Sequence, residues 1–250
     1  MSTRTLWAGF DLDDTLHHFR RAARAGHGAV ADLLAAELGV TADVHAAAEA
    51  HAAAVVGAPE IHFIKGLGQQ DYRRLRYAAT LEHLGHSAAA ETWIPRLLET
   101  FDSRMMASLA TIAGAAELMD AVRAEGRRVA VISNGPQDRC HATLTALGLM
   151  ERVDALLTPN SEGVDKEGGL FERALERLNT VAGDLVYVGD SLRHDVAPAR
   201  RAGIRVVWLK PEVTSEDPYA PPGGAAESGG APKDVPAVTR LADVMAAWRG

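Results

Sequence analysis

The chain has 250 residues, of which 47% are apolar and 24% charged, so it can form one large domain or two small ones with a substantial core. Its formal net charge of −7 argues against a nucleic-acid binder that uses a general basic surface. The single cysteine, Cys140, excludes an internal disulfide and a zinc site built from thiolates. No apolar stretch reaches the ~18 residues of a membrane span, and no signal-peptide pattern begins the chain. We therefore expect a soluble cytoplasmic protein without membrane partners.

The first predicted element is a buried parallel strand over residues 6–10, which are all apolar or glycine. Three acids follow it closely, at Asp11, Asp13 and Asp14. Carboxylates at this density repel one another, and such a cluster is tolerated where a cation or a reaction requires it. Taken alone, the stretch also fits a polar turn in which Asp14 or Thr15 caps a helix.

A helical segment follows at residues 17–110, where no convincing strand is found. Glycines separate four predicted helices, at about 18–38, 42–56, 69–84 and 88–107. His17 and His18 leave the acidic stretch and are candidates to line the entrance of a site. Lys65, Arg73 and Arg76 are candidates to bind an anion, although long charged side chains on helices are usually solvated.

From Ala110 onward, helices and strands alternate. The predicted strands are residues 128–132, 153–157, 185–188 and 204–209. The helices between them cover about 117–125, the stretch from 136 to about 147, 169–178 and about 194–203. This alternation predicts βαβ units with right-handed crossovers. We therefore predict an α/β fold with a doubly wound, Rossmann-like parallel sheet core (residues 1–16 and 111–250), interrupted by an all-helical domain (17–110).

The C-terminal part of this core contains an unusual stretch. Residues 211–236 carry six of the 11 prolines and four glycines, with almost no large apolar side chains. This composition predicts a flexible loop. A closing helix over 238–248 is predicted after it, with Leu241, Val244 and Trp248 on one face.

Polar residues stand at or just after the ends of several predicted strands. The carboxyl ends of parallel strands share one edge of a sheet, where ligands bind in open α/β folds. Side chains far apart in the sequence can therefore converge there. The residues expected at this edge are Asp11, Asp13, Ser133, Asn134, Lys166, Asp190 and Asp195.

These residues resemble the motifs of the haloacid dehalogenase-like (HAD) superfamily of phosphohydrolases. The family's Asp-x-Asp-x-Thr motif is similar to residues 11–15, and its strand-closing Ser or Thr is similar to Ser133. Its Gly-Asp-Ser motif with a second aspartate is similar to residues 189–195. Its lysine is similar to Lys166, although Glu167 replaces the proline that often follows. The helical segment resembles the family's type-1 cap.

The resemblance implies a mechanism with an aspartyl-phosphate intermediate. Asp11 would attack phosphorus as the nucleophile. Asp13 would protonate the leaving group and then deprotonate the attacking water. Family members that dehalogenate carbon lack this second acid, so Asp13 favours phosphoryl transfer.

The resemblance also implies a metal and a phosphate site. The Asp11 carboxylate, the Asp13 carbonyl and Asp190 would hold Mg²⁺, which prefers oxygen ligands. Asp195 would ligate the ion directly, ligate it through water, or orient Lys166. Ser133, Asn134 and the loop N–H groups would bind phosphate oxygens, and Lys166 would neutralise phosphoryl charge.

We therefore expect hydrolysis of a small phosphate monoester, such as a nucleotide, a sugar phosphate or a phosphoglycolate-like compound, with the cap setting substrate choice. The partner is a small phosphorylated metabolite, not a nucleic acid, and the protein is expected to be a monomer or a homodimer. The alternatives are a phosphomutase or phosphonatase on the same scaffold, or a non-catalytic binding or regulatory protein of the same fold. A phosphonatase would need a cap lysine that forms a Schiff base, and Lys65 is the only lysine between residues 17 and 110.

Overall fold

A computed structural model describes residues 5–210 and 232–249. Its centre is a six-stranded sheet in the order β3-β2-β1-β4-β5-β6, with every pair parallel. The strands are β1 (Trp7–Phe10), β2 (Arg128–Ile132), β3 (Ala155–Leu157), β4 (Leu185–Gly189), β5 (Arg205–Leu209) and β6 (Ala237–Val238). The order runs outward from β1 in both directions, which confirms the predicted doubly wound fold.

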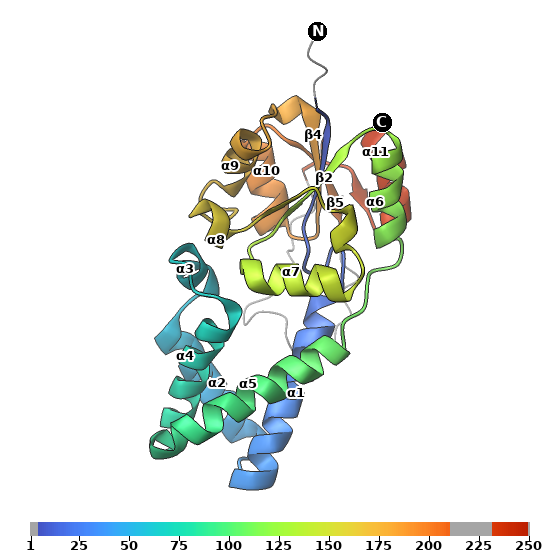
Figure 1. Ribbon diagram of the computed structural model, residues 1–250. Helices are drawn as coiled ribbons and strands as arrows, with labels where there is room; N and C mark the ends of the chain where they lie inside the picture. The colour runs from blue at the N-terminus through green and yellow to red at the C-terminus, as the bar shows by residue number, and fades with distance from the viewer. Residues whose placement is uncertain (1–4, 211–231, 250) are drawn as a thin grey trace.

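Helices cover both faces of the sheet (Figure 1). On one face, α6 (Ala115–Ala124), α7 (Gln137–Ala146) and α11 (Val244–Arg249) pack against a cluster that includes Phe10 and Val131. On the other, α9 (Leu170–Arg177) and α10 (Ala197–Arg201) pack against a cluster that includes Ile132 and Tyr187. Successive residues of a strand, such as Val131 and Ile132, thus point to opposite faces of the pleated sheet, and both faces are buried.

The prediction for the C-terminal region was partly wrong. Residues 237–238 form the edge strand β6, in which Ala237 pairs with Trp208 of β5. The last α-helix begins only at Val244. A two-residue strand has too few positions to show a period. Of the predicted loop at 211–236, residues 211–231 lie outside the described part of the chain, and Val235 is buried.

The helical segment between β1 and α6 contains α1 (Phe19–Leu38), α2 (Ala42–Val56), α3 (Pro59–Ile64), α4 (Gln69–His83) and α5 (Ala90–Ala107). Figure 1 shows these helices grouped below the sheet, away from the helices that cover its two faces, with α1 and α5 packed along each other. They share an apolar cluster of their own, which includes Leu34, Tyr77 and Leu97. Helix α3 was not predicted, because its six residues are too few to show a helical period, although Pro59 stands in its first turn, where proline is favoured.

The two chain crossings between the sheet and the helical segment lie side by side. His18 N–H donates to the Ala110 carbonyl at 3.0 Å, and Ile112 N–H donates to the Leu16 carbonyl at 3.0 Å. The first α-helix after the acidic motif begins at Phe19, so neither Asp14 nor Thr15 is its N-cap residue. Asp14 has a φ of 56° and its carboxylate accepts from Arg20 N–H. Across the described ranges, 5–210 and 232–249, the helices lack the combination of length and hydropathy that a membrane crossing needs.

Candidate active site

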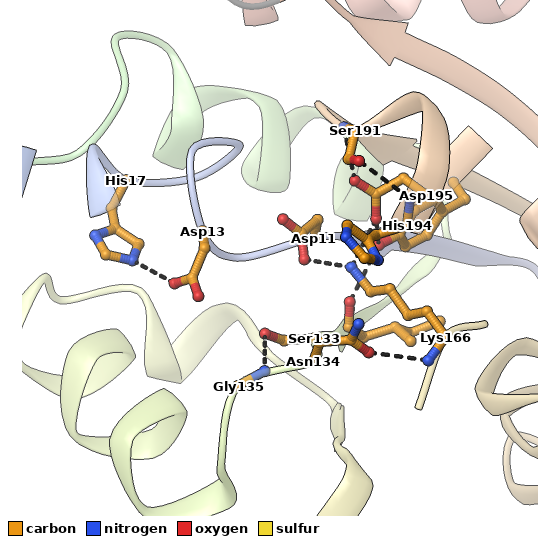
Figure 2. Close-up of polar contacts among 12 residues, drawn as sticks. Asp11, Asp13, His17, Ser133, Asn134, Gly135, Lys166, Ser191, His194 and Asp195 are labelled. Atoms are coloured by element: carbon orange, nitrogen blue, oxygen red, sulfur yellow. Dashed lines mark hydrogen bonds and ion pairs between the residues drawn. The ribbon is translucent and has the colours of Figure 1, made fainter. Parts of the chain in front are cut away.

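Asp11, Asp190, Asp195 and Lys166 meet at the carboxyl edge of the sheet. Figure 2 shows the Lys166 side chain reaching Asp11. Lys166 Nζ donates to Asp11 Oδ1 at 2.5 Å and to Asp195 Oδ1 at 2.6 Å. One oxygen from each of the three aspartates lies within 4.8 Å of the others, and all three residues are buried. Side chains from three separate loops, of which the one after β4 supplies both Asp190 and Asp195, therefore form a single charged cluster with one ammonium group for three carboxyl groups.

Burial is the largest influence on the pKa values in this cluster, and the neighbouring charges modify its effect. Burial raises the pKa of Asp11 to about 8, against the opposing influence of Lys166. Burial also raises the pKa of Asp190 well above its ordinary value, and the neighbouring Asp195 and Asp11 add to the effect. Burial alone would lower the pKa of Lys166, but its two carboxylate partners outweigh burial and raise it.

The donor set of the cluster fits a hard divalent cation. Its aspartates offer only oxygen atoms, and one lysine does not balance their charge. The guanidinium of Arg20 approaches Asp190 to 3.6 Å, but its side chain is 42% exposed and its charge is screened by water. A Mg²⁺ ion at this cluster would supply the missing positive charge.

The loop after β4 directs Asp195 back toward the sheet. Residues Leu192–Val196 form a single π-helical turn, in place of the regular helix that the sequence predicts near His194. Such turns occur often at functional sites. A Cβ atom at Gly189 would lie 2.3 Å from the Asp195 Cγ, so only glycine fits beside this carboxylate. Ser191 N–H donates to Asp195 Oδ2 at 3.0 Å and holds the turn in place.

Tyr187 is a site residue that the sequence analysis missed. It belongs to β4 and is fully buried, and its hydroxyl lies 2.9 Å from Asp195 Oδ1 and 3.1 Å from the Ile132 carbonyl oxygen. The sequence could have indicated this residue, because it is a tyrosine in an otherwise apolar strand and a buried hydroxyl requires a hydrogen-bond partner.

The loop after β2 brings Ser133 and Asn134 beside Lys166. Ser133 Oγ accepts from Gly135 N–H at 3.0 Å, which closes a tight turn before α7. Asn134 Oδ1 accepts from the Lys166 backbone N–H at 2.9 Å. The side-chain carbonyl of Asn134 thus fixes the lysine loop, and its amide group lies near the same edge (Figure 2).

Asp13 lies apart from the lysine cluster and faces His17 (Figure 2). Arg139 of α7 binds it through two contacts, at 2.9 Å to Oδ1 and 2.5 Å to Oδ2, and His17 Nε2 lies 3.0 Å from Oδ1. Burial alone would raise the pKa of Asp13, but Arg139 and His17 outweigh it and lower the pKa below its ordinary value. Sequence reasoning missed Arg139. Its position in the first turn of the helix after the Ser133 loop was the only available signal.

A cavity of about 340 Å³ lies between the site and the helical segment. Its walls include Asp13, Asn134 and Arg139 from the sheet side, and His27 and Arg73 from the helices. Arg73 is 8% exposed, so the expectation that it is solvated was wrong, because it lies over the ring of Phe101.

Three other predicted candidates occupy different places. His17 is fully buried beside Asp13, so it does not line an entrance. Arg76 is half-buried and pairs with Glu49 at 3.0 Å. Lys65 is exposed and does not belong to the cavity wall.

A parallel sheet of this order, with carboxylates and a lysine at its carboxyl edge, defines an α/β protein whose site lies at strand ends. Residues 47–209, more than half of the chain, match the sequence pattern of the haloacid dehalogenase-like hydrolases. The chain belongs to this family and is a hydrolase. The match includes Ser133, Lys166 and Asp190, and begins after the Asp11 motif.

Individual relatives agree with this assignment. The chain is 29% identical over 210 residues to a ribulose-1,5-bisphosphate 5-phosphatase of Halopiger xanaduensis, covering 83% of this chain and 85% of that protein. It is 33% identical over 101 residues to a phosphoserine phosphatase of Thermus thermophilus, covering 40% and 41%.

Solved structures share the fold. A 2-haloacid dehalogenase of Pseudomonas syringae pv. Tomato DC3000 has a TM-score of 0.67 at 21% identity, with 98% of each chain covered. A HAD phosphatase of Thermococcus onnurineus has a TM-score of 0.60 at 18% identity, with 98% of this chain and 99% of that one covered. At these identities the likeness is one of fold.

Proposed function

We propose that the protein is a Mg²⁺-dependent phosphatase that hydrolyses a small phosphate monoester through an aspartyl-phosphate on Asp11. The observation that carries this proposal is the buried cluster in which Lys166 joins Asp11 to Asp195, with Asp190 within reach of the same ion position. Relatives that act on phosphorylated metabolites support the reaction class, including a ribulose-1,5-bisphosphate phosphatase and a phosphoglycolate phosphatase.

In this proposal Asp11 attacks phosphorus, so that a bond forms to its carboxylate oxygen while the bond to the leaving oxygen breaks. Asp13 gives the leaving oxygen a proton and later takes one from the water that hydrolyses the aspartyl-phosphate. Arg139 holds Asp13 ionised in the observed arrangement, so proton donation requires Arg139 to turn away from it.

The other site residues bind the phosphoryl group or the metal ion. Lys166 and Ser133, with the amide of Asn134, bind the phosphoryl oxygens. Mg²⁺ would be held by the carboxylates of Asp11 and Asp190 and the carbonyl of Asp13, with Asp195 as a further ligand or as the partner that orients Lys166. The ion would offset the repulsion between the anionic nucleophile and the phosphate.

We further propose that two parts of the chain have different roles. Residues 1–16 and 111–250 form the catalytic core, and the helical segment at 17–110 acts as a cap that sets substrate choice. The cavity between them supports this division, because its walls come from both parts. The cytoplasmic location and the monomeric or homodimeric state stay predictions.

The test is hydrolysis of p-nitrophenyl phosphate by wild type and by Asp11→Asn. We expect turnover with Mg²⁺, loss of turnover in EDTA, and a drop of at least about 1,000-fold in Asp11→Asn, because asparagine is a similar shape but not a nucleophile. Asp32→Asn, which changes an exposed acid on α1, serves as the matched control and should retain full activity. Turnover of Asp11→Asn at the wild-type rate would show that another nucleophile is used.

The phosphonatase alternative finds no support in the position of Lys65. A Schiff-base lysine must reach the substrate, whereas Lys65 is exposed and outside the cavity wall. Lys65→Arg should therefore leave phosphatase turnover unchanged. No observation favours a phosphomutase, and membership of a hydrolase family weighs against a purely regulatory role.

A further inference from the structure

Among the described residues, one arginine of the cavity wall has no carboxylate in direct contact. Three arginines line its walls, namely Arg73, Arg76 and Arg139. Arg139 pairs with Asp13, and Arg76 pairs with Glu49. Within residues 5–210 and 232–249, Arg73 forms no ion pair with a carboxylate, and Asp102 of α5 acts on it only at longer range. A third carboxylate, Glu60, also lines the cavity, but it forms no ion pair with Arg73 in the described part of the chain. Arg73 is thus the arginine of this wall that has no carboxylate in direct contact.

The surroundings of Arg73 fix its guanidinium at the cavity wall. The side chain is 8% exposed, and its guanidinium carbon lies 3.2 Å from the centre of the Phe101 ring. The amide oxygen of Gln69, when turned toward it, lies 2.8 Å from Nε and 2.9 Å from Nη2. Neither neighbour carries a negative charge. Burying a cation without an anion is costly, so this arrangement favours an anionic ligand.

We propose that the cavity binds phosphate monoesters whose leaving group carries a second anionic group, a phosphate or a carboxylate, and that Arg73 binds that group. The inference rests on the proposed phosphatase function and names its substrate class. The volume of about 340 Å³ suits a small metabolite that spans from the strand-end site on one wall to Arg73 on the helical wall. The planar guanidinium matches both kinds of anion through paired hydrogen bonds.

The test compares matched substrates on the intact protein. The pairs are fructose 1,6-bisphosphate with fructose 6-phosphate, for a second phosphate, and 2-phosphoglycolate with glycerol 2-phosphate, for a carboxylate. Wild type should prefer the anionic member of at least one pair by about 10-fold or more in kcat/KM. The pair with the larger preference identifies the second group.

Arg73→Gln should lower kcat/KM for the preferred anionic substrate by about 10- to 100-fold, mainly through KM, because uniform binding is lost. Turnover of the neutral member and of p-nitrophenyl phosphate should change by no more than about twofold. Arg74→Gln, an exposed arginine one residue further along α4, is the matched control and should behave as wild type. Arg73→Lys keeps the charge and should recover part of the loss.

Two results would overturn the inference. One is equal wild-type kcat/KM for the anionic and neutral members of both pairs. The other is an equal loss in Arg73→Gln on every substrate while the variant remains folded by circular dichroism. If Arg73→Gln does not fold, the wild-type preference and its weakening in Arg73→Lys decide the question. Mg²⁺-dependent hydrolysis of p-nitrophenyl phosphate by wild type would persist in either case, so the proposed reaction would stand.

Discussion

Two aspartates that are two residues apart in the sequence have opposite surroundings in the structure. Asp11 is buried, its pKa is raised to about 8, and a lysine is its closest cation. Asp13 faces away, toward Arg139 and His17, and its pKa is lowered. A pair of acids whose environments separate their pKa values is typical of sites where each acid has a different task. Here the difference between the two pKa values depends on Arg139 of α7, which contacts Asp13 in the loop after β1 from a distant part of the sequence.

His27 offers a measurable pH effect in the cavity wall. It lies on α1 with its ring centroid 5.0 Å from that of Phe101. Burial lowers its pKa from 6.5 to about 4, and the nearby Arg73 and Arg76 act in the same direction, against Glu49. His45, a further titratable neighbour, also lowers the pKa.

The sign of the effect follows from proton binding. Between about pH 6.5 and 4 the unfolded chain protonates this imidazole and the folded chain does not, so the free energy of unfolding falls as the pH drops through this range. His27→Gln should remove about 2 kcal/mol of this fall, allowing for the partial exposure of the ring. Urea unfolding at several pH values measures the difference, and His141→Gln, an exposed histidine on α7, is the control. A constant difference between wild type and His27→Gln from pH 7 to pH 4 would contradict the assignment.

At the scale of elements, the helical segment and the core are joined through helix ends. The Asp138 carboxylate on α7 accepts from Gln69 N–H, the first residue of α4, at 3.1 and 3.3 Å. Asn160 of α8 (Pro159–Glu162) donates to the carbonyls of Phe63 and Leu67 at 3.0 and 2.9 Å. The first contact satisfies an N–H group that the start of α4 leaves open, and the second joins α8 to the end of α3 and the loop after it. These bonds hold the cavity wall that carries Arg73 against the strand-end site.

Asp138→Ala should loosen this junction. Asp138 caps α4 from another helix, so its loss should cost about 1 kcal/mol and raise the local opening of residues 63–70. Hydrogen exchange measured by mass spectrometry should show faster exchange in that stretch, with little change in β1. Glu82→Ala, an exposed acid on the same helix, is the control. Unchanged exchange at 63–70 in Asp138→Ala would mean that Asn160 alone holds the junction.

The elements also show which features a sequence can predict. The periodicity and glycines of α1, α2 and α4 placed these helices to within about two residues. Helix α3 and strand β6 are too short to show a period. The meeting of Asp11 with Asp190 and Lys166 follows from one topological rule about strand ends. The partners of Asp13 and Arg73 do not follow from this rule, because they depend on how helices that are far apart in the sequence pack together.

For the whole molecule, the apolar contacts fall into separate clusters, two on the sheet and one among the helices. The chain crosses between the sheet and the helices at 16–18 and 110–112, close to the acidic loop. The charged cluster therefore lies where the two parts meet, and it is unfavourable for stability while its negative charges remain unbalanced. Stability of the entire fold should thus respond to a cation at this one position.

Mg²⁺ should raise the melting temperature of wild type. A ligand that binds only the folded chain contributes about 2.7 kcal/mol at 100 times its dissociation constant, or roughly 5 to 10 °C for a chain of this size. Asp190→Asn removes one buried carboxylate, so without metal it should melt at least as high as wild type, because the repulsion with Asp11 and Asp195 is relieved.

The same variant should lose most of the Mg²⁺-dependent rise, since a neutral amide is a weaker ligand for a hard cation. Asp32→Asn, an exposed acid on α1, should keep the full rise. Differential scanning calorimetry of the three proteins, in EDTA and in increasing Mg²⁺, separates the two effects. If Mg²⁺ raises the melting temperature of Asp190→Asn as much as that of wild type, the ion binds elsewhere. If the variant is stable without metal and its melting temperature no longer responds to Mg²⁺, the stability of the whole fold depends on the charge balance at the end of β4.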